Sequence, residues 1–121
     1  MTLEQCKRLK EMGFPQGTGV SAYWELSKDR IELWHTRNLH MATEICCNPT
    51  AEEALDWVAG KLTEKGFVIN FLISENFIST ISTTVMNAVT NEKKFIEIFD
   101  TLSDAVYALI EWAHENKLLE A

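Results

Sequence analysis

Two hydrophobic segments decide the fold of this chain: Phe67-Val-Ile-Asn-Phe-Leu-Ile-Ser74 and Phe77-Ile-Ser-Thr-Ile-Ser-Thr-Thr-Val85. In both segments the odd-numbered positions carry most of the bulky apolar side chains, as expected of strands with one buried face. Their β-branched and aromatic residues favour a strand over a helix. The two segments are therefore predicted to be neighbouring antiparallel strands whose odd-numbered residues face the core.

A third strand is predicted at 94–99, Lys-Phe-Ile-Glu-Ile-Phe. The segment Ser74-Glu75-Asn76 marks the first turn, and the polar run 87–93 marks the second. The third strand is apolar on both sides except at Glu97, so its pattern does not predict which side faces the core. The whole stretch 67–100 is thus expected to form a three-strand antiparallel meander.

A helix with a similar start is predicted on each side of the meander. Thr50 can cap the first helix by accepting a hydrogen bond from the Glu53 backbone N–H, while the Glu53 side chain reaches back. Thr101 and Asp104 repeat the pattern with a shorter acid. Gly66 ends the first helix. Each start precedes an apolar stripe at helical spacing, which consists of Ala51, Ala54, Leu55, Val58 and Leu62 in the first helix and of Leu102, Ala105, Val106, Leu109, Ile110, Trp112 and Ala113 in the second.

The first half of the chain is predicted to hold a short helix and a hairpin. The helix is expected over 2–12, with a capping box at its start and an apolar stripe. Strands over 20–26 and 31–36 then surround a polar turn. The connector 37–49 either extends the second strand or lies over the sheet.

These elements predict an α+β fold in the order helix, hairpin, helix, three-strand meander, helix. The chain of 121 residues is expected to be one domain, 1–121, with 50–118 as its helix–three-strand–helix core. The predicted strands are expected to form one largely antiparallel sheet, with the helices packed on it.

The hairpin register separates two faces with different chemistry. The face predicted to be core holds four apolar side chains, namely Trp24, Leu26, Ile31 and Leu33. The opposite face is the candidate binding surface, which consists of Tyr23, Trp34, Glu25 and Glu32. A pair of large aromatic side chains left in water is typical of a contact site. Two alternatives stay open: the first helix or the connector covers the pair, or a register slip of one residue exchanges the faces.

Composition narrows the functional classes. The net charge is −7, with acidic residues spread along the chain, and the Lys and Arg residues form no basic stripe. No apolar run approaches the ~18 residues of a membrane span. The three cysteines, an odd number, do not suggest a disulfide framework. The chain is therefore expected to be a soluble cytoplasmic protein with reduced thiols, and to bind neither nucleic acid nor membrane.

Residues of metal-ligand type gather in one segment, at His35, His40, Cys46 and Cys47. Adjacent cysteines do not readily face the same tetrahedral ion, and no Cys-x-x-Cys or His-x3-His frames the group. We therefore expect neither a metal nor another cofactor. Glu25 and Glu32 form a carboxylate couple that could serve hydrolysis, so a small hydrolase is the third functional hypothesis.

The order and length of the elements in 50–117 resemble those of double-stranded-RNA-binding domains. Members of that family carry a basic cluster at the start of the last helix. Here the matching residues are Asp100-Thr-Leu-Ser-Asp104. The resemblance therefore implies a shape and not RNA binding.

Three further segments, 1–16, 49–58 and 100–109, carry a resemblance to small uncharacterised proteins of bacteriophages and mobile elements. It implies a bacterial or phage accessory protein and supplies no catalytic residues. The leading hypothesis is a non-enzymatic interaction protein that binds a protein partner or associates with itself. The alternative is an acidic DNA mimic that inhibits a nucleic-acid enzyme.

Net charge leads to a first prediction. The purified protein should not bind duplex DNA or RNA at physiological salt, because its charge of −7 repels the phosphate backbone. An electrophoretic mobility shift assay measures this directly. A complex tighter than about 10⁻⁶ M, beyond the usual non-specific range, would contradict the prediction.

Overall fold

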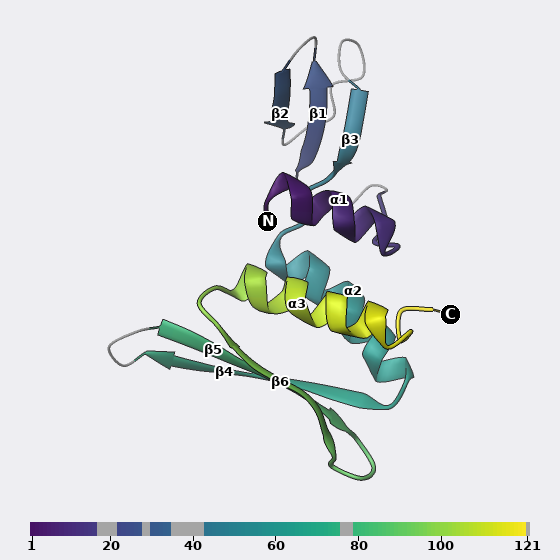
Figure 1. The fold of residues 1–121 in the computed structure, drawn as a ribbon, viewed down its shortest axis with the longest axis vertical. Helices are drawn as coiled ribbons and strands as arrows, with labels where there is room; N and C mark the ends of the chain where they lie inside the picture. The colour runs from purple at the N-terminus through teal and green to yellow at the C-terminus, as the bar shows by residue number, and fades with distance from the viewer. Residues whose placement is uncertain (17–21, 28–29, 35–42, 76–78, 121) are drawn as a thin grey trace. The chain divides into compact units, whose positions relative to one another are not determined.

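The computed structural model describes residues 1–16, 22–27, 30–34, 43–75 and 79–120. It has an α+β fold, as predicted. Its elements follow in the order α1 (Leu3–Glu11), β1 (Tyr23–Ser27), β2 (Arg30–Trp34), β3 (Thr43–Cys47), α2 (Ala51–Glu64), β4 (Phe67–Glu75), β5 (Ser79–Asn87), β6 (Lys93–Phe99) and α3 (Leu102–Glu115). The strands form two antiparallel sheets, β2-β1-β3 and β4-β5-β6, where one sheet was expected (Figure 1).

The chain divides into two compact units, 1–53 and 54–121, which we call unit 1 and unit 2. The sequence predicts a single domain. No linker sequence marks the boundary between the two units, because this boundary falls inside α2. Within the described residues, no helix has the length and apolar character needed to cross a membrane.

The sheet of unit 2 buries its odd-numbered face, as the period-two pattern predicts. Ile81, Thr83 and Val85 of the central strand are buried. Phe95 pairs with Val85, and Phe99 pairs with Ile81, so β6 turns its odd-numbered residues to the same side. This is the orientation that the sequence leaves open. Helix α3 contacts β5 and β6, and α2 and α3 lie on one side of the sheet (Figure 1).

The predicted helix caps are confirmed. The Thr50 hydroxyl accepts a hydrogen bond from the Glu53 N–H at 3.1 Å, and the Glu53 carboxylate accepts one from the Thr50 N–H at 2.9 Å. The Thr101 hydroxyl accepts from the Asp104 N–H at 3.1 Å. After α2 the chain turns at Gly66, whose φ of +85° favours glycine. The helices bury apolar stripes formed by Ala54, Val58 and Leu62 in α2 and by Ala105, Val106, Leu109, Ile110 and Ala113 in α3.

The even-numbered face of the same sheet is exposed. Leu72 and Ile98 both pair with Ser82, so the three residues form one row across the strands. Leu72 is 66% exposed and Ile98 is 67% exposed. The two sides of this sheet therefore differ sharply in what they contribute to stability.

Unit 1 contains a strand that the sequence does not predict. The second part of the connector 37–49 forms β3, which pairs antiparallel with β1. Trp24 pairs with Cys46 and Glu25 pairs with Glu44, so Ile45 is an extra residue in a β-bulge. The residues 35–42 and the hairpin turn at 28–29 lie outside the described residues.

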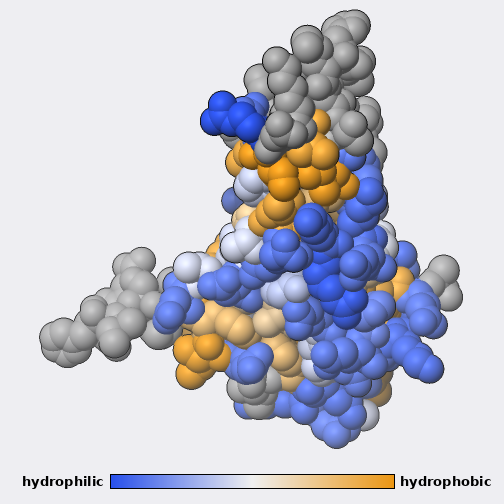
Figure 2. Space-filling model, turned by 45° about the horizontal axis from the view of Figure 1, so that its top comes forward, coloured by the Kyte–Doolittle hydropathy of each residue, from blue (hydrophilic) through white to orange (hydrophobic). Residues whose placement is uncertain are grey.

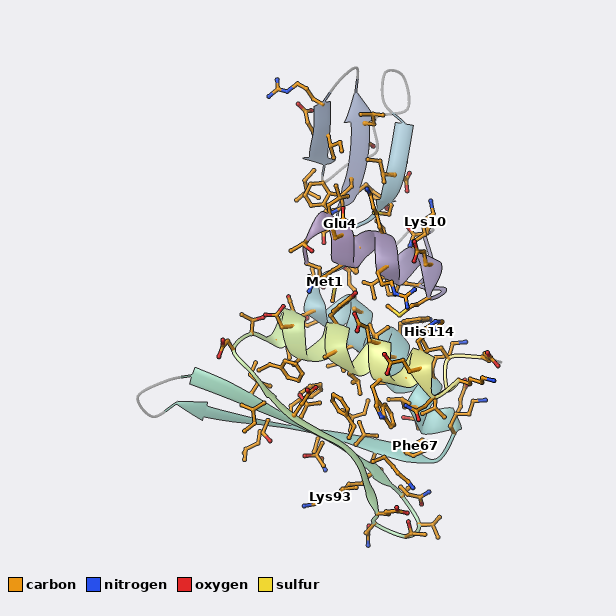
Figure 3. The ribbon with its side chains drawn as sticks, in the orientation of Figure 1. Met1, Glu4, Lys10, Phe67, Lys93 and His114 are labelled. Atoms are coloured by element: carbon orange, nitrogen blue, oxygen red, sulfur yellow. The ribbon has the colours of Figure 1, made fainter. Side chains whose placement is uncertain are left out.

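Helix α1 packs against β3. It begins with the predicted capping box, in which the Thr2 hydroxyl accepts from the Gln5 N–H at 3.2 Å. The Lys10 ammonium group donates to the carbonyl oxygen of the bulged Ile45 at 2.9 Å (Figure 3). The Cys6 thiol lies 3.3 Å from the Asn48 side-chain oxygen. These contacts connect one side of α1 to the strand and the residue after it.

The predicted hairpin register is confirmed, but the prediction of its core face is wrong. Tyr23 and Glu25 are buried, at 6% and 1% exposure. The face predicted to be core is exposed at Leu26 (41%), Ile31 (48%) and Leu33 (41%). Apolar surface of unit 1 is visible in Figure 2. The error has a physical reason: in a strand pair with apolar residues on both sides, the pattern alone does not show which side the rest of the chain covers.

The three cysteines belong to the core of unit 1. All are free and buried. Burial raises the pKa of the Cys6 thiol. Burial, followed by the proximity of Cys6, raises the pKa of Cys46 and of Cys47 to about 11. The thiols are therefore protonated at neutral pH and serve as small apolar side chains.

The contrast between the two faces of unit 2 can be measured by truncating one leucine on each. Leu109→Ala removes a fully buried side chain of α3 and should lower the free energy of unfolding by about 2–5 kcal/mol. Leu72→Ala removes the same atoms from an exposed position and should change it by no more than about 0.5 kcal/mol. Urea unfolding of both variants tests this. Equal losses would show that the even-numbered face is packed.

The thiols give a prediction with a defined pH dependence. At pH 8 a thiol with a pKa of about 11 is thiolate to about 0.1%, compared with roughly a quarter for a free cysteine. Alkylation of Cys46 and Cys47 by iodoacetamide should therefore be at least about a hundredfold slower in the folded protein than in urea. Mass spectrometry of timed samples measures the rates. Modification of either thiol at the rate of a free cysteine would contradict the structure.

The same shift affects stability. A thiol whose pKa is higher in the folded than in the unfolded chain binds its proton more tightly when folded. For Cys46 and Cys47 this contribution is complete below about pH 8.5 and is lost as the pH rises through about 11.

Candidate functional site

The structure does not present the predicted binding surface as an exposed aromatic pair. Tyr23 and Glu25 are buried, which agrees with the alternative that other parts of the chain cover this face. Glu32 is half-buried, with Arg30 Nε at 3.9 Å from its carboxylate. The backbone of Trp34 pairs with Tyr23 as predicted, and the structure does not describe the Trp34 side chain. A role of these four residues in binding stays a prediction.

The carboxylate couple of the hairpin is part of a longer row. Glu25 pairs with Glu32 on one side and with Glu44 on the other, so the three side chains share one face of the sheet. Glu25, at the centre, is buried. Within the described ranges, no three His, Cys, Asp or Glu side chains are grouped so that they could hold a metal ion. His35 and His40 lie outside those ranges.

Unit 2 contains a groove between β6 and the second half of α3. Its volume is about 590 Å³, within the range of ligand pockets. From the helix come residues spaced three or four apart, which share one face. From the strand come alternate residues on the covered face and one displaced lysine. The lining consists of Ala108, Glu111, Trp112 and Glu115 from α3 and of Lys94, Phe95, Glu97 and Phe99 from β6.

A β-bulge places the lysine at this groove. Val85 pairs with Phe95, but Met86 pairs with Lys93, so Lys94 is the extra residue in β6. Bulges commonly redirect a side chain in this way. The Lys94 ammonium group forms an ion pair with the Glu92 carboxylate at 3.0 Å, so part of its charge is already neutralised.

Aromatic rings form the apolar part of the groove. The ring centroids of Phe95 and Trp112 are 5.6 Å apart with an interplanar angle of 40°. Phe67, at the start of β4 (Figure 3), meets the same indole edge-on at 6.3 Å. Both distances are typical of favourable aromatic pairs. Trp112 is therefore held by ring contacts while one part of it lines the groove.

Three carboxylates give the groove its charge. Among the described residues, no hydrogen bond or ion pair is made by the side chain of Glu97, Glu111 or Glu115. Glu111 and Glu115 are one turn apart near the C-terminal end of α3. Like charges at this spacing repel each other, and the helix dipole disfavours negative charge at that end. Folding does not explain this arrangement.

A buried hydroxyl lies next to the acidic residue of the strand. Thr83 pairs with Glu97, so the two side chains stand on the same face of the sheet. Thr83 is fully buried, and its Oγ1 has no hydrogen-bond partner among the described residues. Such a group is uncommon in the interior of a protein.

The groove was not predicted from the sequence, because its lining depends on which face of β6 meets α3. Without that orientation, Glu97 cannot be placed on the face that α3 covers. One signal was present in the sequence: Glu111 and Glu115 flank Trp112 at the helix end that disfavours acids. An open groove with unpaired carboxylates and aromatic walls is suited to binding a cation that also has an apolar or planar surface.

Comparison with known protein families, curated proteins and solved structures finds no match to this chain. The resemblances to phage proteins and to double-stranded-RNA-binding domains therefore stay predictions. The function is therefore inferred from the geometry of the chain itself, which includes the acidic, aromatic groove of unit 2.

Proposed function

We propose that this chain is a non-enzymatic, cytoplasmic interaction protein that binds a protein partner through the groove between β6 and α3. One observation carries the proposal: three carboxylates without a described partner surround aromatic walls in one groove. Their mutual repulsion costs stability, and a partner that supplies positive charge would remove this cost. Aromatic side chains such as Trp112 are the favoured anchors of protein interfaces.

The composition of the lining favours binding over catalysis. The groove offers carboxylates, one lysine and apolar side chains, and its lining includes no Ser, Thr or Cys nucleophile beside a histidine base. It is also open rather than enclosed, so it does not exclude water as many catalytic sites do.

The proposal predicts that a partner is lost when the groove is changed. Wild-type protein and the Glu111→Gln/Glu115→Gln variant are used as baits in a lysate of the native host, and a captured protein is identified by mass spectrometry. The purified partner is then titrated against each bait by calorimetry. Its dissociation constant should rise at least about tenfold for the groove variant.

A control variant separates the groove from general charge. Glu52→Gln/Asp56→Asn removes two acids, also one turn apart, from exposed positions of α2, and it should leave the affinity unchanged. Equal weakening by both variants would refute the groove as the contact site. The groove would also be refuted if Leu72→Ser abolished binding of the partner while the groove variant retained it. Displacement of the partner by duplex DNA would instead indicate the acidic mimic.

A further inference from the structure

We propose that the groove accepts an arginine side chain from a basic segment of the partner. This inference rests on the proposed function and specifies the chemistry of its ligand. The guanidinium group would lie against the ring of Trp112 or Phe95 and donate hydrogen bonds to Glu97, Glu111 and Glu115. All five residues line the same groove.

The charge of the groove favours a cationic ligand. Three carboxylates and one lysine line the groove, and the lysine is paired with Glu92. A positively charged ligand therefore gains attraction from several sides. It also relieves the repulsion between Glu111 and Glu115, which share one face of α3 and lie near its negative end. An anionic or neutral ligand gains neither effect.

The shape of the groove favours a planar donor group. A guanidinium is planar, carries five N–H donors and stacks on aromatic rings, whereas an ammonium is a compact and strongly hydrated charge. The groove combines carboxylates from a helix and from a strand with the tilted rings of Phe95 and Trp112. One planar group can meet both kinds of surface at once. Arginine therefore fits better than lysine.

The test uses the full chain and three capped peptides that differ in one residue. Acetyl-Gly-Ser-Gly-Arg-Gly-Ser-Gly-amide is compared with peptides that carry lysine or the neutral isostere citrulline in place of arginine. Binding is followed by the NMR signal of the Trp112 indole N–H, assigned with Trp112→Phe. The signals of Trp24 and Trp57 are internal controls. The arginine peptide should shift the Trp112 signal, with a dissociation constant on the order of 1 mM or below.

The variants show whether the effect is local. The affinity for the arginine peptide should fall about tenfold or more in Glu111→Gln/Glu115→Gln, and it should remain within about twofold of wild type in Glu52→Gln/Asp56→Asn. The lysine peptide should bind more weakly, and the citrulline peptide should not shift the signal. Thermal melting of each variant verifies that unit 2 is folded.

Three results would overturn the inference. They are the absence of a shift at about 10 mM arginine peptide, equal binding of the citrulline peptide, and equal weakening by the control variant. If a protein partner is lost on the groove variant while the arginine peptide fails to bind, the proposed function stands and the arginine assignment falls. If the arginine peptide binds at the groove but every partner resists the groove variant, the assignment stands and the proposed function falls.

Discussion

The burial of one sheet face under α3 is the interaction on which the rest of unit 2 depends. Leu109, Ile110 and Val85 are fully buried, and α3 contacts both β5 and β6. The same packing creates the groove, because β6 is an edge strand and its covered face meets the second half of the helix. The packing of α3 on the sheet thus sets both the position of the core and the position of the candidate site. A change in how α3 lies on β6 would alter both.

The predicted elements of unit 2 are confirmed because their signals are local. The period of two in β4 and β5, the threonine caps and Gly66 each act through neighbouring residues. The strand β3 was missed because its pairing with β1 is a long-range contact. The core face of the hairpin was wrong for a similar reason. Both of its sides are apolar enough to be buried, and the hairpin sequence does not indicate that other residues cover the side with Tyr23 and Glu25.

The candidate site could not be predicted, although each of its residues is visible in the sequence. Glu97 could be assigned to the site only from the strand register, which places it opposite Thr83 on the covered face. Glu111 and Glu115 can be interpreted from the sequence alone, because acids at the C-terminal end of a helix lower its stability. A sequence pattern that works against folding is a useful pointer to a surface selected for another purpose.

Trp112 is half-buried; its ring contacts Phe67 and Phe95, and its remaining surface lines the groove. Occupation of the groove and folding of unit 2 are therefore thermodynamically linked, and a bound ligand reduces how often the unit opens. Cellular proteases remove opened chains, so a chain with an empty groove would be degraded faster than one whose groove is occupied. Turnover would then adjust the amount of the chain to the amount of a groove ligand, without a separate regulatory site.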